Sequence, residues 1–593
     1  MISNVISYLP VGSARYQGTT DSDCRFIQER QLKDRALWKK FVGVFRTRPD
    51  GENEEWRGEF WGKMMRGACL TYRYTADKEL YDVLTETVRD LLTAQDEIGA
   101  FSSYPTEKQY SGWDIWGRKY VLTGLLHFYD ICKDEDLKKD VLTAAERHLD
   151  VIAHDVGEGD GKRNVLDTSD AWGALNSCSI LEVVLDAYAR IPKPEYLALA
   201  KHLIDCGGSS KGNMIEAALD KNLLPSHYPV KKSYESISYY EGVLEYYRLT
   251  GEQKYLDAVT NYVTLLAEHE NTEIGALGVY KEEWDDSTKN QTVPQPHIGL
   301  ETCVTVTWMR MLTRLYLLTG DNHYIDQIDL SAFNGLRGAI NFEGQIFFDE
   351  HRLVNDFISA LPFDSYSPVL NGKRGRVAAG YLRFEEGGDY GCCASIGSAG
   401  TALLPLLSVV KTADGYAINE YLAGSVKAED GFAFTLCGNY PLDAHYTFTV
   451  QESDETERTV AFRIPAWCNS AVVDGKQYVH TDGYARVTRK WKAGEFVTIT
   501  LNFGITKRVQ DGLTAYRYGT ITLARDSEKE NCPDLAAPLT GAGELQRVAP
   551  GKGELLRFTL PHDGGTAIFT DYASCGRTWL KLNSRISVWN NVK

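Results

Sequence analysis

YRLTGEQKYLDAVTNYVTLLAEH, residues 247–269, decides the fold, because variants of its first half return along the chain. The counterparts begin at Tyr72, Tyr129, Tyr188 and Tyr316, at intervals of roughly 55 to 70 residues. In each copy a short turn with Gly, Asp or Pro is followed by a segment with apolar residues at i, i+3, i+4 and i+7, the spacing of one helix face. The repeating unit is therefore predicted to be a pair of helices.

Five such pairs make up most of a closed ring of helices. The region 380–410 has room for a sixth pair, so we expect an (α/α)6 barrel. An open solenoid would produce the same repeat, but the length of the chain and the candidate site residues between its helices favour closure.

After residue 412 the apolar period changes from 3.6 to 2, as in HYTFTVQ at 445–451 and YRYGTITLAR at 516–525. The chain is thus predicted to be a multidomain α plus β protein, an (α/α)6 barrel followed by C-terminal β-sandwich domains. The expected divisions are an N-terminal segment that could pair with the β region, 1–15, the barrel, 16–412, a β-sandwich, 413–511, and a second β-sandwich or its continuation, 512–593.

The composition restricts the classes of partner. The formal charge of −17 is spread along the 593 residues, which argues against nucleic acid because phosphate binding needs a basic surface. No apolar window of about 18 residues predicts a membrane span, and residues 1–16 lack the basic and apolar regions of a signal peptide. We expect a soluble, cytoplasmic protein with no membrane or nucleic-acid partner, and the β region leaves a homodimer open.

The twelve cysteines are too few for the disulfide framework of a small secreted domain. Glu301 and Cys303 form an ETC motif, and Cys392 and Cys393 are adjacent. Thiolates are the soft ligands that select zinc, and an oxygen is tolerated as the fourth ligand. The four residues are therefore a candidate Zn²⁺ site, although their spacing is not that of a zinc finger and buried core thiols are the alternative.

Three motifs resemble glycoside hydrolase family 127 and its relatives, the β-L-arabinofuranosidase group: ETCVTVTWMR at 301–310, GDYGCCASIG at 388–397 and GYAINEYLAGSV at 415–426. The resemblance implies that Glu301, Cys303 and Cys393 hold a zinc ion and that Cys392 is both a zinc ligand and the nucleophile. It also implies a hydrolase that retains the anomeric configuration through two displacements. Zinc would keep the thiol as a thiolate at neutral pH.

A retaining mechanism needs a second acid for the leaving oxygen. In the family this residue is a Glu before the ETC motif, with an aromatic residue two positions after it (Glu-x-aromatic). The sequence KEEWDD at 281–286 offers Glu282, with Glu283 as the alternative. Without the resemblance, either residue would be interpreted as part of a solvated acidic loop.

The resemblance is weaker where the sugar would be held. The family is expected to bind sugar hydroxyls with histidines of the inner helices, whereas Lys119 and Tyr240 occupy such positions here. A guanidinium beside an ammonium suits a carboxylate, so Arg118 and Lys119 point to a carboxylated, pectin-type sugar, unless the pair bonds barrel carboxylates such as Glu59 or Asp114. The expected substrate contacts are Arg118, Lys119, Trp113, Glu59 and Tyr240.

Two other functions stay open at this point. An (α/α)-barrel lyase, epimerase or uronyl hydrolase would use His, Tyr or Asp without zinc, and a carbohydrate-binding protein without catalysis would need only a closed structural zinc site. The leading expectation is an exo-acting retaining hydrolase of a furanoside, with an oligosaccharide or glycoside as substrate. His297, four residues before Glu301, is a further candidate for the cleft.

Overall fold

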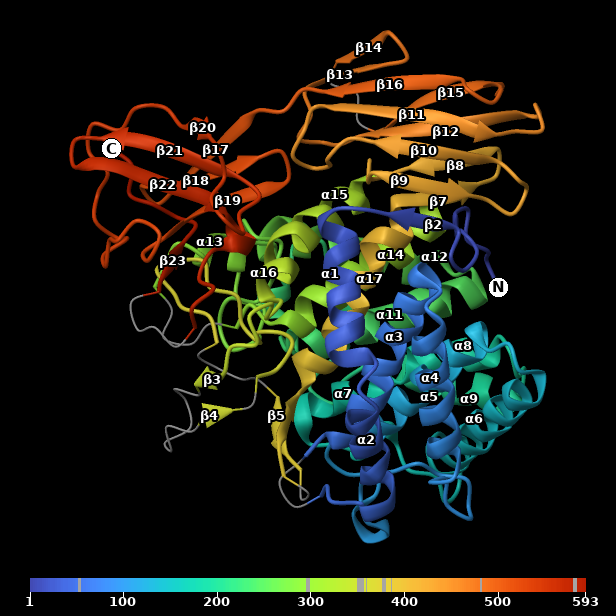
Figure 1. Cartoon of the computed structure of the whole chain (residues 1–593). Coiled ribbons are helices and arrows are strands. Elements are labelled where there is room, and N and C mark those ends of the chain that lie inside the picture. The colour runs from blue at the N-terminus through green and yellow to red at the C-terminus, as the bar shows by residue number, and fades with distance from the viewer. Residues whose placement is uncertain are drawn as a thin grey trace.

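The computed structural model describes residues 1–51, 55–294, 299–348, 357–358, 360–375, 380–384, 387–479, 483–579 and 584–593. It is a mixed helix and sheet protein of several domains, with most helices before residue 408 and the large sheets after it (Figure 1). His297 lies outside the described residues. No helix in the described ranges is long and apolar enough to cross a membrane.

Six helices form a closed succession of contacts, in which each packs against the next and the last returns to the first. Nearly every residue of these helices is buried, as expected for an inner layer that is covered on all sides. They are α3 (Phe60–Thr75), α5 (Asp114–Ile131), α8 (Leu181–Tyr188), α11 (Ser233–Thr250), α14 (Thr302–Thr319) and α17 (Cys392–Ser408).

An outer helix follows each of the first five inner helices and packs against it. All five predicted junctions therefore join two helices. Local signals explain the junctions: Leu80 N donates to Asp77 Oδ1 at 2.8 Å at the start of α4, and Gly251 and Gly320 end α11 and α14 at positive φ. The outer helices are α4 (Lys78–Leu92), α6 (Glu135–Asp155), α9 (Pro194–Asp205), α12 (Gln253–Leu265) and α15 (His323–Leu330).

The other helices complete the helical part. α1 and α2 precede the ring, α7 leads into α8, and α10, α13 and α16 lie in connections. Their bounds are α1 (Thr19–Ile27), α2 (Arg35–Thr47), α7 (Leu175–Cys178), α10 (Met214–Leu219), α13 (Ser287–Asn290) and α16 (Arg337–Ala339).

Three large sheets follow, and N-terminal strands join two of them. The first, in spatial order, is β1 (Ser7–Tyr8), β7 (Val409–Thr412), β8 (Gly415–Ile418), β12 (Glu457–Ile464) and β15 (Gly483–Lys490). The second is β14 (Lys476–Val479), β13 (Ser470–Val473), β16 (Phe496–Leu501), β11 (His445–Glu452), β10 (Ala433–Cys437), β9 (Gly424–Lys427) and β2 (Ala14–Tyr16). The third is β17 (Ile505–Gln510), β18 (Leu513–Tyr518), β19 (Ile521–Asp526), β22 (Gly565–Asp571), β21 (Arg557–His562) and β20 (Gln546–Val548), with β23 (Ile586–Ser587) beside β19.

Two short hairpins lie between α16 and α17. They are β3 (Phe347–Phe348) with β4 (Phe357–Ile358), and β5 (Tyr381–Arg383) with β6 (Asp389–Gly391). The second leads directly into α17 and so places Cys392 at the start of that helix.

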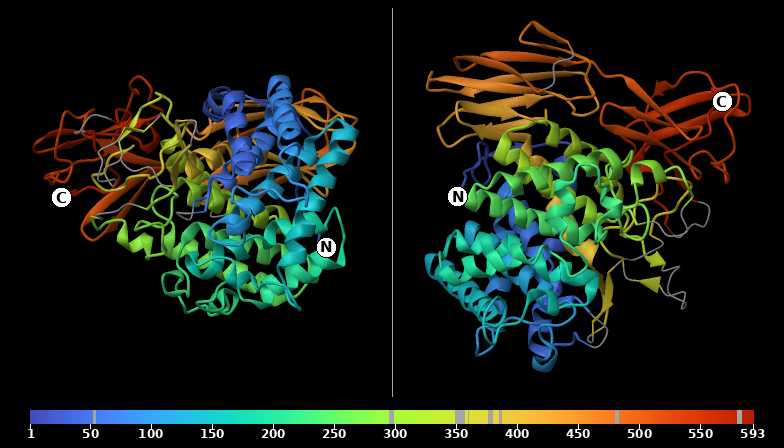
Figure 2. Two further views of the ribbon diagram at one scale, coloured as in Figure 1. Left: turned by 90° about the horizontal axis from the view of Figure 1, so that it is seen from below. Right: turned by 180° about the vertical axis from the view of Figure 1, so that it is seen from behind.

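The sheets meet the helical part at the end where α17 runs into β7, and the third sheet lies beside the other two (Figures 1 and 2). The N-terminal strands β1 and β2 pair with β7 and β9. β17 already pairs with β18, so the division expected after residue 511 falls in the turn of this hairpin. Gly512 takes φ 76° in that turn. Turn residues such as this glycine occur inside a sheet as well as between sheets, so they do not by themselves mark a domain boundary.

Candidate active site

A pocket of about 120 Å³, here called the front pocket, opens at the N-terminal ends of the inner helices. Because α3, α5, α11, α14 and α17 all begin there, the positive ends of their dipoles meet at the pocket and favour anionic groups. The lining residues are Trp56, Glu59, Lys63, Trp113, Trp116, Lys232, Tyr234, Glu235, Glu282, Glu301, Gly380 and Cys392.

The four residues of the predicted metal site lie together beside this pocket. Glu301 and Cys303 stand at the start of α14, and Cys392 and Cys393 begin α17. All four are buried, and their ligand atoms lie within 4.8 Å of one another. Cys393 Sγ is 3.4 Å from both Cys303 Sγ and Glu301 Oε1, whereas Cys392 Sγ is 3.5 Å from Glu301 Oε1 and 3.9 Å from Cys393 Sγ.

These separations suit a tetrahedral metal ion. Zinc bonds to sulfur of about 2.3 Å would place two thiolates about 3.8 Å apart, close to the distances between the sulfur atoms here. Glu301 Oε2 is buried and has no hydrogen-bond partner among the described residues. The cluster could therefore hold one metal ion.

Of the three thiols, only Cys392 lines the front pocket. The contacts with Cys303 and Cys393 and the charge of Lys63 lower the pKa of Cys392 well below its usual range, against the effect of burial. Burial raises the pKa of Cys303 and of Cys393. The thiol that faces the pocket is thus the one whose anionic, nucleophilic form is favoured.

Gly380 makes room for this thiol. A Cβ atom at Gly380 would lie 2.2 Å from Cys392 Sγ, and the residue takes φ 53°, which favours glycine. Its carbonyl accepts a hydrogen bond of 3.2 Å from Trp56 Nε1. The backbone of the hairpin before α17 therefore packs directly against the Cys392 sulfur atom at Gly380.

Glu282 faces the front pocket and Glu283 does not. Glu282 accepts a hydrogen bond from the Tyr366 hydroxyl at Oε1 and pairs with Lys232 Nζ at Oε2. Its backbone lies in the left-handed region, at φ 59°. Glu283 pairs instead with Lys231 at 3.3 Å and is 26% exposed. Of the two carboxylates, Glu282 is the one placed to exchange a proton with a molecule in the pocket.

A buried ion pair between Lys63 and Glu59, next to aromatic rings, forms one wall of the front pocket. Lys63 Nζ donates to Glu59 Oε1 at 2.7 Å, and both side chains are buried. The ammonium also lies 4.4 Å from the ring centroid of Tyr234 and 5.6 Å from that of Trp116. Burial raises the pKa of Glu59 to about 7, although Lys63 opposes the shift. Glu59 is thus placed in the pocket, as expected from the sequence.

Glu235 is a further carboxyl of the pocket. It is 2% exposed, and its Oε2 has no hydrogen-bond partner among the described residues. Burial raises its pKa, and the charge of Lys232 opposes this. An unsatisfied buried oxygen in a pocket is suited to accept a hydrogen bond from a ligand hydroxyl.

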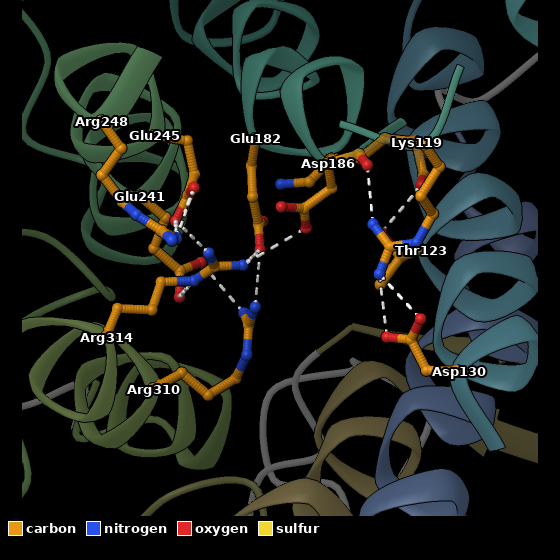
Figure 3. Close-up of polar contacts among 11 residues, drawn as sticks. Lys119, Thr123, Asp130, Glu182, Asp186, Glu241, Glu245, Arg248, Arg310 and Arg314 are labelled. Atoms are coloured by element: carbon orange, nitrogen blue, oxygen red, sulfur yellow. Dashed lines mark hydrogen bonds and ion pairs between the residues drawn. The ribbon is translucent and has the colours of Figure 1, made fainter. Parts of the chain in front are cut away.

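Arg118 and Lys119 do not line the front pocket. Arg118 Nε donates to Asp114 Oδ2 at 2.9 Å, so it bonds one of the barrel carboxylates that the sequence offered as the alternative partner. Lys119 Nζ donates to Ser179 Oγ at 3.2 Å, and its side chain extends toward Glu182 (Figure 3). Successive helix residues point about 100° apart, so these two neighbours reach different surroundings.

The other expected sugar contacts divide in the same way. Trp113 lines the pocket, with its ring 5.8 Å from that of Trp56. Tyr240 is buried, donates to Met214 O at 2.5 Å and packs against Tyr262. Tyr240 therefore serves the packing between helices and is not part of the pocket lining.

Several residues of the site were missed by the sequence analysis. Lys63 and Lys232 resemble ordinary helix and cap residues, and only a turn of α3 links Lys63 to the predicted Glu59. The weak signal for these two lysines was their position, since each lies within five residues of the start of an inner helix. The missed residues include Trp56, Lys63, Lys232, Tyr234, Glu235, Tyr366 and Gly380.

Comparisons with known proteins agree with this geometry. Residues 19–353 match the family model described as "Beta-L-arabinofuranosidase, GH127 catalytic domain", and residues 415–503 match the model described as "Beta-L-arabinofuranosidase, GH127 middle domain". No curated protein matches the sequence.

Solved structures share the fold along nearly the whole chain. A GH127 β-arabinofuranosidase has a TM-score of 0.73 at 16% identity, covering 100% of this chain and 99% of its own. A GH127 β-L-arabinofuranosidase from Geobacillus stearothermophilus T6 has a TM-score of 0.71 at 16% identity, covering 98% and 100%. A further glycoside hydrolase has a TM-score of 0.69 at 15% identity, covering 99% and 98%.

Proposed function

The chain belongs to glycoside hydrolase family 127, the β-L-arabinofuranosidase family, and from this premise we propose that it is a retaining exo-hydrolase of a furanoside. The observation that carries the proposal is the Glu301, Cys303, Cys392 and Cys393 cluster, which presents one thiol to a pocket that also contains Glu282. A closed structural metal site in a non-catalytic protein would not need a ligand in the lining of a pocket.

We infer that the helical part is the (α/α)6 barrel and that its six-helix ring is the inner layer. The first two large sheets would form one β-sandwich and the third sheet a second β module. This division supports a catalytic domain whose chemistry lies entirely at one end of the ring.

The proposed cofactor is Zn²⁺, held by Glu301, Cys303, Cys392 and Cys393. Three sulfur ligands and one oxygen match the preferences of zinc over magnesium or calcium. When bound, the ion would keep the cysteine thiols deprotonated at neutral pH.

Cys392 is the proposed nucleophile. Its sulfur forms a bond to the anomeric carbon while the bond from that carbon to the leaving oxygen breaks, and Glu282 gives its proton to that oxygen. In the second step Glu282 takes a proton from water, the water oxygen bonds to the anomeric carbon, and the carbon–sulfur bond breaks. Two inversions give net retention. Tyr366 and Lys232 hold both oxygens of Glu282 in place.

The pocket supports a small, neutral sugar. Its volume of about 120 Å³ suits a single furanose ring and hence removal of a terminal residue. Glu59 and Glu235 offer oxygens for sugar hydroxyls, and Trp56 and Trp113 offer ring faces. The case for a carboxylated pectin sugar rested on Arg118 and Lys119, which lie outside the lining. We therefore favour a β-L-arabinofuranoside-like substrate.

Zinc content tests the metal site directly. Protein purified without added metal should contain about one zinc per chain, and Cys303→Ala should contain almost none. Cys178→Ala is the matched control, because Cys178 is an equally buried free thiol away from the cluster. Equal zinc in all three proteins, or none in a folded wild type after zinc is supplied, would reject the site. A thiol-directed furanoside should then label Cys392 only in the zinc-loaded protein.

A further inference from the structure

A second pocket, here called the rear pocket, lies at the opposite end of the inner helices. Its volume is about 320 Å³, and its lining comes from the C-terminal halves of α3, α5, α11, α14 and α17 together with the N-terminal segment. It shares no lining residue with the front pocket. The lining residues are Asn4, Tyr8, Leu70, Arg73, His127, Asp130, Arg248, Arg310, Thr313, Arg314, Leu317 and Leu403.

Three of its four arginines belong to an ion-pair network between α8, α11 and α14 (Figure 3). Arg310 bonds Glu241 at 2.9 Å and Glu182 at 2.8 Å. Arg314 contacts Glu182 and lies 2.6 Å from Glu245, and Arg248 pairs with Glu245 at 2.9 Å. Arg314 also lies 3.6 Å from Asp186, so each carboxylate of this network already has a guanidinium partner.

The carboxylate of the lining itself is matched as well. Asp130 accepts from Arg190 Nη2 at 2.9 and 2.8 Å through its two oxygens. Arg190 also donates from Nη1 to Asp186 O at 2.7 Å. No lining carboxylate is thus left over for the fourth arginine.

Arg73 is that fourth arginine. In the described part of the chain its guanidinium makes no hydrogen bond or ion pair. Tyr8 also lines the pocket. Burial raises the pKa of its phenol to about 12, and the charge of Arg73 is the largest of the effects that oppose this. A neutral hydroxyl donor therefore stands close to an unmatched cation.

Arg66 adds a second unmatched cation behind the first. It lies on the same face of α3 as Leu70 and Arg73, at spacings of four and three residues. It is 0% exposed, and none of its three side-chain nitrogens has a hydrogen-bond partner among the described residues. Burial lowers the pKa of His127, a lining residue, and the charge of Arg66 is the second largest cause of this shift. Arg66 therefore lies close to the inner part of the rear pocket.

We propose that the rear pocket binds a small oxyanion, the phosphate or carboxylate group of a metabolite, with Arg73 as its anchor. The planar guanidinium of Arg73, which is half-buried, can donate two parallel hydrogen bonds to such groups. The charge of the fully buried Arg66, which has no hydrogen-bond partner among the described residues, adds to the attraction for an anion. The C-terminal ends of the inner helices oppose an anion, so the cations Arg73 and Arg66 have to outweigh the helix dipoles. The pocket lies where the helical part meets β1, and boundaries between structural units are common places for ligand sites.

Titration calorimetry of the full chain with inorganic phosphate and with citrate, at constant ionic strength, tests the proposal. We expect saturable binding of one anion per chain. Arg73→Gln should weaken it at least about tenfold, as expected for loss of a charge-assisted bond, and Arg73→Lys should retain part of the affinity. Arg89→Gln, which breaks a surface pair with Asp134, is the matched control and should bind as the wild type does.

Three results would overturn the site. These are no saturable binding of either anion, equal binding by Arg73→Gln, or loss of binding in Lys63→Met, which alters only the front pocket. Circular dichroism shows whether each variant is folded. If Arg73 only stabilises the C-terminal ends of the inner helices, Arg73→Gln lowers the melting temperature and leaves the titration unchanged. None of these measurements depends on glycosidase activity.

Discussion

Replacing Glu282 by Gln tests the assignment of the acid and base. The substitution keeps the size of the side chain and the left-handed backbone, and it removes the proton that would be transferred. Loss of general acid and base catalysis lowers a rate by about 10²- to 10⁴-fold. The upper part of this range is expected here, because the ammonium of Lys232, whose side chain is 12% exposed, also loses its anionic partner.

The matched control is Glu283→Gln, one residue along the same loop. Glu283 is partly exposed and lies 3.3 Å from Lys231, itself 44% exposed. Solvent weakens such pairs to about 0–1 kcal/mol, so kcat should change by less than about threefold. The two variants should thus differ by a factor of about 300 or more if the placement of Glu282 determines the chemistry.

The assay uses two β-L-arabinofuranosides that differ in the leaving group. A nitrophenolate leaves without much help from an acid, whereas an alkoxide needs the proton, so Glu282→Gln should lose more activity on the alkyl furanoside. Zinc content, measured in parallel, shows that the metal site is intact. A large loss in Glu283→Gln with little change in Glu282→Gln would refute the reasoning. A similar small loss in both would place the acid elsewhere, with Glu235 as the next candidate carboxyl of the pocket.

Two further predictions concern buried charges. Arg463 on β12 is 0% exposed and forms ion pairs with Asp326, Asp329 and Glu420. Arg463→Met should therefore lower the free energy of unfolding, measured in urea, by about 3–5 kcal/mol. Arg486 is exposed, so Arg486→Met should change it by less than about 0.5 kcal/mol, and equal effects of the two substitutions would contradict the prediction. Burial lowers the pKa of Lys119 to about 7, so above that pH this lysine is protonated in the unfolded chain and neutral in the folded one. The wild type should therefore gain stability relative to Lys119→Met by roughly 2 kcal/mol between pH 7 and 9. A stability difference that does not change with pH would contradict the shift.

The helical repeat was predictable because its signals are local. The turn around Gly251 and the apolar spacing after it are properties of one short segment. The division after residue 511 was less predictable, because the turn at Gly512 belongs to a hairpin within one sheet. Strand patterns alone do not say which sheet a strand joins.

The site residues were predictable where a motif fixes them at the start of a helix. Cys392 is the first residue of α17 and Glu301 is the N-cap of α14, and α3, α5, α11, α14 and α17 all begin at the front pocket. Position along the chain then places these residues at the pocket end of the ring. The four predicted ligands accordingly meet within 4.8 Å.

Residues further along a helix depend on its rotation, which the sequence does not state. Arg118 and Lys119 lie one turn into α5, where a step of one residue turns the side chain by about 100°. Arg118 consequently turns back to Asp114 and Lys119 lies beside Ser179. The same argument applies to Tyr240 in α11. Lys63 and Arg73 reach opposite ends of the ring for another reason, since the step of ten residues from one to the other advances α3 by about 15 Å along its axis. The position of a site residue can therefore be predicted from a motif at a helix start, whereas in a helix interior it also needs the packed structure.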